Sequence, residues 1–235
     1  MKNLNVLPDL TGKSAIIFER MWFADESQYL KNSDIYYILA IDRKIYLKDN
    51  WIFTSMQGAS MSASLAERLI RTGVNKIIRI GTTGSLKTEI GLYELILPVA
   101  IVKDEGASNQ YVFNSFPCIC DINLLQKVEN ILQETSYKFH RGIGWTTDGR
   151  WIESLEKMHK LVEWNVLGVD METSGIYTVC QLHKIPSVAL NIVTDYPLKS
   201  EKDGLKGIPL NYKDYKKNLI LHVNNIIKIL VQNIS

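Results

Sequence analysis

The sequence predicts an α/β fold in which a mixed, mainly parallel central sheet lies between layers of helices, and three observations support this. Strand-like apolar runs alternate with helix-like segments along the chain. No repeat, low-complexity tract or Pro/Gly/Ser-rich linker divides the 235 residues, so residues 1–235 are expected to form one domain. Hydrophobic residues make up 46% and charged residues 22%, which suits a chain with a buried core and excludes disorder.

Short apolar runs and one amphipathic segment define the first half of the sheet. A helix is expected over Ser60–Arg71 because its apolar residues recur at helical spacing, and Gly73 follows where a C-terminal cap belongs. The last strand is expected to end at Ile80 and to run into a glycine turn, Gly81–Gly84. The predicted strands are Ser14–Phe18, Ile35–Ile41, Trp51–Ser55 and Lys76–Ile80.

The second half continues the alternation of strands and helices. The predicted strands are Leu95–Val102, Val166–Val169 and Pro186–Val193. The predicted helices are one that Asp121 caps and that runs through Leu132, then Ile152–Val162, Thr173–His183 and Tyr212–Ile234. Ligands of such sheets bind at the carboxyl ends of the strands, which directs attention to the residues after Ile80, Val169 and Val193.

Charge and composition exclude several classes of partner. The net charge of +2 is too small for a nucleic-acid-binding surface. No segment is apolar and long enough to cross a membrane, and Met1–Leu10 does not resemble a secretory signal, so we expect a cytoplasmic protein without a membrane partner. Three cysteines fit a reducing compartment, and Cys118-x-Cys120 lacks further partners at zinc spacing, so no metal site is expected.

Arg79 and the glycines after it form a candidate anion site. An arginine near the end of a buried strand is costly unless it is paired. Gly81 and Gly84 flank Thr82 and Thr83, so backbone N–H groups and hydroxyls are exposed together, and a guanidinium beside them suits phosphate. The alternative is a structural ion pair beside an ordinary turn.

Carboxylates follow two further predicted strands. Glu172 and Asp170 bracket Met171 where a strand passes into a helix, a place where a carboxylate can accept hydrogen bonds from sugar hydroxyls. The alternative is capping of the helix N-terminus by acidic residues. Asp195 follows a buried strand, where desolvation favours a general acid; a turn-initiating Asp before Pro197 is the alternative.

In this order, three segments resemble the nucleoside phosphorylase family that includes uridine phosphorylase and the hexameric purine nucleoside phosphorylases. They are Arg79–Leu86 (RIGTTGSL), Val169–Tyr177 (VDMETSGIY) and Thr194-Asp195. The likeness extends to Lys103–Ser108 (KDEGAS), Tyr111, Phe116-Pro117 and Thr146–Asp148, so it covers about Gly58 to Asp195.

The resemblance implies an enzyme in which bound phosphate attacks the anomeric carbon of a nucleoside, releasing a free base and a pentose 1-phosphate. It implies that Arg79 and Thr82 hold phosphate, and that Thr83 and Gly84 line the floor between phosphate and base. Met171 would pack beneath the ribose and Glu172 would bind its 2′- and 3′-hydroxyls. Inorganic phosphate is then a co-substrate, and no cofactor is expected.

The resemblance also bears on the base. Purine-cleaving members carry an Asp at the position of Asp195, which protonates N7 as the base departs. Uridine phosphorylases hold uracil with a Gln and an Arg, where this chain has Ser154 and Glu156, so a purine is expected. Trp151 stands where relatives have an aromatic residue and is a candidate for stacking on the base, beside Arg150, which has no clear role.

The N-terminal segment departs from the family pattern. Members have a Gly-Asp-Pro-x-Arg loop that donates to phosphate, whereas this chain reads Phe18-Glu-Arg-Met-Trp22. Arg20, or Arg43 in a neighbouring subunit, is a candidate replacement donor, since members form dimers that build hexamers. Three other readings stay open: a uridine phosphorylase, a hydrolase resembling methylthioadenosine/S-adenosylhomocysteine nucleosidase, and a nucleoside-binding protein without turnover.

Overall fold

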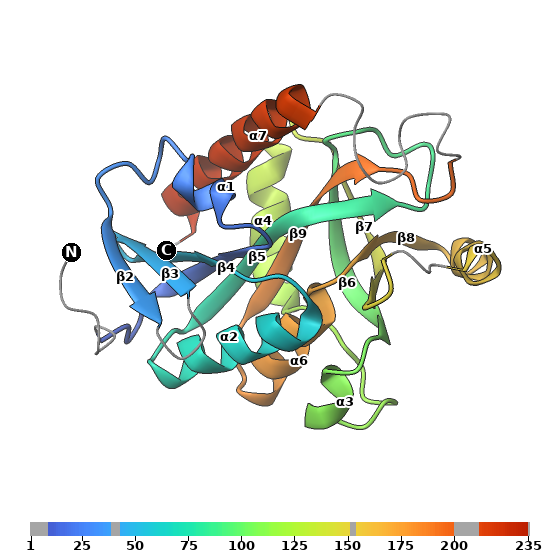
Figure 1. Ribbon diagram of the computed structural model, residues 1–235, viewed down its shortest axis with the longest axis horizontal. Coiled ribbons are helices and arrows are strands. Elements are labelled where there is room, and N and C mark those ends of the chain that lie inside the picture. Colours follow the sequence, from blue (N-terminus) through green and yellow to red (C-terminus); the bar gives the residue numbers. More distant parts are fainter. Residues whose placement is uncertain (1–8, 39–42, 151–153, 200–211, 235) are drawn as a thin grey trace.

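The structure, a computed structural model, describes residues 9–38, 43–150, 154–199 and 212–234. Its described strands form one sheet in the order β2-β3-β4-β1-β5-β8-β7-β6-β9 (Figure 1). The strands are β1 (Ser14–Phe18), β2 (Asp34–Ile38), β3 (Arg43–Lys48), β4 (Trp51–Ser55), β5 (Lys76–Ser85), β6 (Leu95–Asp104), β7 (Phe139–Thr147), β8 (Val166–Asp170) and β9 (Ser187–Asp195).

The sheet is mixed and mainly parallel, as the sequence predicts. β1 runs parallel to β4 and β5, β5 to β9, and β7 to both β6 and β8. The pairs β2–β3, β3–β4, β5–β8 and β6–β9 are antiparallel. Because β5 pairs with β9 as well as β8, the strands β5, β8, β7, β6 and β9 close into a ring, and β5 joins this ring to the open part of the sheet.

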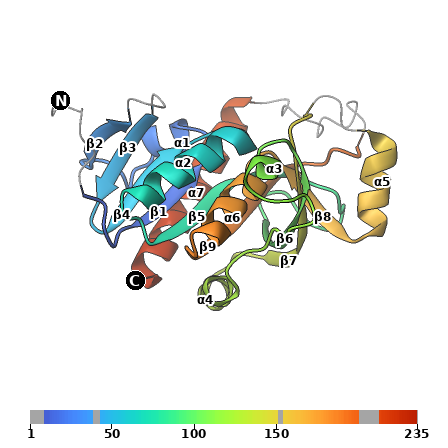
Figure 2. The same cartoon turned by 90° about the horizontal axis from the view of Figure 1, so that it is seen from below.

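Helices cover both faces of the sheet (Figures 1 and 2). The helices are α1 (Trp22–Asp25), α2 (Ala59–Arg71), α3 (Ser108–Tyr111), α4 (Ile122–Gln133), α5 (Leu155–Glu163), α6 (Thr173–Leu182) and α7 (Tyr212–Asn233). Side chains of β1 alternate between the faces: Ala15 and Ile17 pack with α2 and α6, whereas Ile16 and Phe18 pack with α4 and α7. This explains why β1 is buried along its whole length and is apolar after Ser14.

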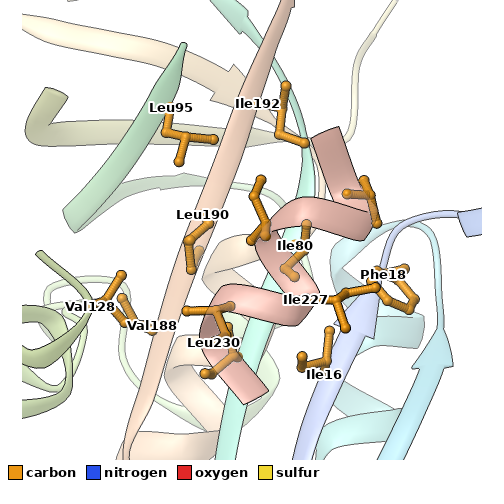
Figure 3. Close-up of a cluster of buried hydrophobic side chains, with 14 of the residues drawn as sticks. Ile16, Phe18, Ile80, Leu95, Val128, Val188, Leu190, Ile192, Ile227 and Leu230 are labelled. Carbon is orange, nitrogen blue, oxygen red and sulfur yellow. The ribbon is translucent and has the colours of Figure 1, made fainter. Parts of the chain in front are cut away.

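The larger core lies beneath α7. Ile227 and Leu230 of that helix face Ile16 of β1, Ile80 of β5 and Leu190 of β9, and each of these side chains is fully buried (Figure 3). Burying one such aliphatic side chain stabilises a fold by about 1.5–3 kcal/mol. The long C-terminal helix is therefore held against the central strands that carry the candidate site.

The predicted glycine turn at Gly81–Gly84 is wrong, because β5 continues as a strand through Ser85. Residues 81–83 stay in register with β9, so hydrogen bonding to that strand prevails over the local preference of glycine for turns. The glycines serve close packing instead. A Cβ added at Gly81 would lie 2.5 Å from Cζ of Arg79, and one at Gly84 would lie 2.5 Å from Cγ of Pro197.

Other differences concern elements with weak sequence signals. Strands β3 and β7 and the short helices α1 and α3 were not predicted; β7 carries Gly142 and Gly144, which interrupt the apolar pattern but pack against Leu167 and Ile101. The predicted strand to Ile41 and helix from Ile152 extend into residues outside the described ranges. Within the described residues, no helix is both long and apolar enough to cross a membrane.

Candidate active site

Arg79 lies in the middle of β5 with 1% of its surface exposed, and acidic side chains surround it. Its Nη2 donates to Oε2 of Glu172 over 2.7 Å, and its Nη1 donates to Oδ1 of Asn191 on β9. Oδ2 of Asp170 and Oε2 of Glu19 each lie 3.8 Å from the guanidinium. One cation is therefore shared by three carboxylates from the ends of β1 and β8.

Burial and charge act in opposite directions on this cluster. Burial by itself lowers the pKa of Arg79, but the carboxylates of Asp170, Glu172 and Glu19 raise it above the usual value, so the guanidinium stays charged. Burial raises the pKa of Glu172; Arg79 opposes this rise, and the charges of Glu19 and Asp170 add to it. Three carboxylates thus lie around Arg79, and one of them, Glu19, is also paired with Arg20 at 3.0 Å.

Glu172 occupies the junction between β8 and α6, where the sequence places it. Its Oε1 accepts a hydrogen bond from the backbone N–H of Gly58 over 2.9 Å, while Oε2 takes Arg79. Gly58 has φ of +78°, a conformation that glycine adopts without strain, and it precedes α2. Two segments far apart in the chain thus fix this carboxylate, and the half-buried Met171 stands directly before it.

Asp170 serves a structural purpose. Its oxygens accept from the hydroxyl of Thr146 over 2.7 Å, the amide of Asn191 over 2.8 Å and the N–H of Thr173 over 3.2 Å at the start of α6. Asp170 therefore caps the N-terminus of α6, which was the alternative role for both carboxylates. Glu172 does not take this role, because its side chain makes no capping bond.

In the glycine-rich segment, Thr82 directs two hydrogen-bond donors at the same acceptor. Its backbone N–H and its hydroxyl both donate to Oε2 of Glu19, over 2.8 and 2.7 Å. Glu19 directly follows β1, is 6% exposed, and accepts at Oε1 from Nε of Arg20 over 3.0 Å. The Glu19 carboxylate thus accepts from the Thr82 donors that the sequence analysis expects to bind phosphate.

Sequence reasoning missed Glu19, although a signal for it existed. Phe18 pairs with Ile80 in the parallel ladder between β1 and β5. An acidic residue placed directly after β1 therefore emerges at the carboxyl end of that strand, beside the residues of β5 that follow Ile80. The apolar run Ser14–Phe18 followed by Glu-Arg is the pattern that marked the other candidate sites.

Thr83 and Gly84 contribute mainly to packing. The hydroxyl of Thr83 donates to the carbonyl of Val169 over 2.8 Å, and the side chain is 3% exposed. Gly84 lies against Pro197 and Val169, with no room for a side chain. Because the Thr83 hydroxyl already donates to Val169, the expected floor between phosphate and base would be formed by the backbone of β5.

Asp195 ends β9 and is paired in register with Gly84, which places it at the same end of the sheet as Thr82. Its Oδ1 accepts from the hydroxyl of Thr194 over 3.1 Å. Thr194 also hydrogen-bonds to Tyr215 of α7, a residue that no sequence pattern singled out. Burial raises the pKa of Tyr215 to about 12, and the charges of Glu19 and Asp195 add to the rise.

Of the remaining candidates, Arg20 contacts a described residue of this cluster. Nε of Arg43 donates to Sδ of Met56 over 3.2 Å, and Arg20 pairs with Glu19. Arg150 is exposed just beyond β7, and Trp151 lies outside the described residues. In the part of the chain that the structure describes, no three His, Cys, Asp or Glu side chains are grouped so that they would hold a metal ion.

The chain is similar in sequence to known nucleoside phosphorylases. A sequence profile of the phosphorylase superfamily matches residues 45–234. A DeoD-type purine nucleoside phosphorylase of Buchnera aphidicola subsp. Schizaphis graminum is 30% identical over 161 residues, covering 66% of this chain and 68% of that protein. A DeoD-type purine nucleoside phosphorylase of Streptococcus thermophilus is 29% identical over 151 residues, covering 64% and 70%.

Solved structures show the same fold. Purine nucleoside phosphorylase from Toxoplasma gondii in complex with immucillin-H aligns with a TM-score of 0.78 at 20% identity, covering 99% of each chain. Uridine phosphorylase from Vibrio fischeri ES114 aligns with a TM-score of 0.76 at 20% identity, covering 95% of this chain and 92% of that one. The mixed sheet between helices is thus the fold of both kinds of protein.

Proposed function

Because the chain belongs to the phosphorylase superfamily and is an enzyme of its nucleoside phosphorylase family, we propose that it cleaves the N-glycosidic bond of a purine nucleoside. In this proposal inorganic phosphate is the acceptor, and the products are a free base and a pentose 1-phosphate. The observation that carries the proposal is the buried Arg79–Glu172 pair, which sets a guanidinium from the middle of β5 and a carboxylate from the β8–α6 junction 2.7 Å apart.

The pair suits a reaction that builds positive charge on a sugar. Glycosidic cleavage passes through an oxocarbenium-like state, which a carboxylate at the ribose hydroxyls and an anion beneath the anomeric carbon both stabilise. Glu172 is held rigidly by Gly58 and Arg79, so it is positioned before substrate arrives. Arg79 and the donors of Thr82 would orient phosphate, and Met171 would pack against the sugar.

Two features favour a purine as the base. The DeoD-type relatives are named purine nucleoside phosphorylases, and the family resemblance assigns proton donation to the leaving base to Asp195. The positions that would hold uracil are engaged elsewhere: Ser154 caps α5 by accepting from Lys157, and Glu156 pairs with Lys160 on the same helix.

A panel of nucleosides tests the base and the acceptor together. Inosine, adenosine and uridine are incubated with the purified chain in saturating phosphate and in phosphate-free buffer, and base and sugar products are separated. The proposal expects purine release only with phosphate, together with pentose 1-phosphate. Uridine cleavage without purine turnover would overturn the purine assignment, and free pentose formed equally in both buffers would overturn phosphorolysis.

Hydrolysis of the same bond is a second candidate, and one observation favours it. The Glu19 carboxylate already accepts from both donors of Thr82, so phosphate is not needed to satisfy them. Water would then be the acceptor, as in the nucleosidases that the sequence analysis considered. The panel separates the two candidates by the identity of the sugar product.

We also propose that the chain forms a homo-oligomer, a dimer or a hexamer. Phe113 has 86% of its surface exposed, and Phe116, Ile119 and Ile122 near it are exposed as well. Apolar surface of this kind is typical of a contact between subunits. Light scattering of the purified chain is expected to give a multiple of 26.8 kDa, and a monomeric mass would contradict the proposal.

A further inference from the structure

Glu19 holds the position in which an anion would satisfy Thr82. A single oxygen, Oε2, accepts from the backbone N–H and from the hydroxyl of Thr82, and the same oxygen lies 3.8 Å from Nη2 of Arg79. This oxygen accepts two hydrogen bonds and also lies within ion-pair distance of a guanidinium, which is the environment that suits a phosphate oxygen. With 6% of its surface exposed, this carboxylate is part of a built site.

The charge balance shows that Glu19 is not required to neutralise Arg79. Glu172 already pairs with this guanidinium at 2.7 Å, and Asp170 lies at 3.8 Å. Glu19 is a third carboxylate beside this guanidinium; it pairs with Arg20 at 3.0 Å and contributes to the raised pKa of Glu172. Three carboxylates therefore share the guanidinium groups of Arg79 and Arg20, which leaves one negative charge in excess. A structural partner for a buried arginine would not need this excess, whereas a stand-in for an anionic substrate produces it.

We propose that Glu19 is a built-in competitor of phosphate, whose carboxylate must leave Thr82 before phosphate binds. The proposal rests on the proposed function in taking the Arg79–Thr82 site as the phosphate site. Phosphate and the Glu19 carboxylate need the same two donors, and two anions cannot share them without strong repulsion. The residue thereby sets the affinity of the enzyme for its acceptor.

The position of Glu19 in the chain allows its carboxylate to move away from Thr82. Glu19 lies between the end of β1 and the start of α1, outside any strand or helix. Its other oxygen, Oε1, accepts from Nε of Arg20, a side chain that is 34% exposed. Rotation of the Glu19 side chain towards Arg20 would free the donors of Thr82 and keep the carboxylate paired nearer to solvent.

The test is a direct measurement of phosphate binding without nucleoside. Calorimetric titration with inorganic phosphate compares the unaltered chain with Glu19→Ala, which removes the carboxylate, and Glu19→Gln, which keeps its shape but removes its charge. Both variants are expected to bind phosphate at least about tenfold more tightly, because a like charge is removed from the site. Glu156→Gln, which changes an exposed carboxylate on α5, is the matched control and is expected to bind like the unaltered chain.

The outcomes separate this inference from the proposed function. Tighter binding in both Glu19 variants supports the inference, and the sugar product then decides between phosphorolysis and hydrolysis. Equal, measurable affinities in all four proteins would overturn the inference and leave phosphorolysis standing. Absence of phosphate binding in all four, with free pentose as the product of nucleoside cleavage, would overturn both. Because Glu19→Gln preserves side-chain volume, a folding defect limited to Glu19→Ala would not remove the test.

Discussion

Nη2 of Arg79 lies 2.7 Å from Oε2 of Glu172, and the two residues have 1% and 5% of their surface exposed. They come from β5 and from the β8–α6 junction, 93 residues apart in the chain. Breaking a buried ion pair by removing one partner is costly, since the other charge stays buried and unpaired. This pair is therefore expected to support both the fold and the substrate site.

Arg79→Ala is expected to destabilise the protein by about 3–5 kcal/mol, because it leaves the carboxylates of Glu172 and Asp170 buried without their guanidinium. Urea unfolding followed by circular dichroism measures the change. Arg71→Ala is the control, because Arg71 is 69% exposed in an i,i+4 pair with Glu67 and should cost no more than about 0.5 kcal/mol. Equal effects of the two variants would show that the Arg79 pair is unimportant for stability.

Gly81→Ala is expected to displace the Arg79 side chain. The added Cβ would lie 2.5 Å from Cζ and from Nη2 of Arg79, and such overpacking costs about 1–3 kcal/mol. Nucleoside cleavage should fall along with stability, because the guanidinium is moved from Glu172 and Thr82. Gly106→Ala is the matched control: nothing lies within 4 Å of its added Cβ, so both properties should stay unchanged. Full activity in Gly81→Ala would contradict the assignment of Arg79.

Asp195→Asn is expected to slow purine nucleoside cleavage by roughly 10²–10⁴, because an amide cannot supply the proton that the departing base needs. Steady-state assays with inosine measure the effect. The matched control is a substrate: a nucleoside methylated at N7 carries a leaving base that needs no proton, so the variant should cleave it at nearly the normal rate. A similar loss on both substrates would assign Asp195 to packing rather than to proton transfer.

Tyr215 predicts a specific loss of stability at high pH. Burial raises the pKa of its hydroxyl to about 12, above the value near 10 that an unfolded tyrosine has, so the folded state binds this proton more tightly. Its contribution to stability is constant below pH 10 and is lost as the pH rises from 10 to 12. Denaturant unfolding across this range should show a shallower decline for Tyr215→Phe than for the unaltered chain. An identical decline in the free energy of unfolding for both proteins would contradict the raised pKa of Tyr215 and its burial beside Thr194.

The sequence predicted the elements whose signals are local. Strands β1 and β4 agree with prediction at both ends because each contains a short run of apolar residues that a local pattern reveals. The Asp121 cap is confirmed, since its side chain accepts from the N–H of Leu124 over 2.7 Å. The end of β5 was not predictable in this way, because its extension through the glycines depends on pairing with β9, more than a hundred residues away.

The same distinction applies to the candidate site. The sequence selected Arg79 as a charge within a buried strand and Glu172 as a carboxylate after another strand, and the structure brings the two into contact. It did not select Glu19, which acts on Thr82 across 63 residues, or Tyr215, which reaches the cluster from α7. The place of Tyr215 depends on how the C-terminal helix packs, which no local pattern shows. Glu19 follows an apolar run as other candidates do, and its proximity to Thr82 follows only from the pairing of β1 with β5.

The most direct test of the account follows the sugar product of inosine cleavage by ³¹P NMR. In saturating phosphate, the unaltered chain is expected to form one pentose 1-phosphate for each hypoxanthine released, and Arg79→Ala is expected to form almost none. Release of hypoxanthine with free ribose, at a rate that phosphate does not change, would contradict the account.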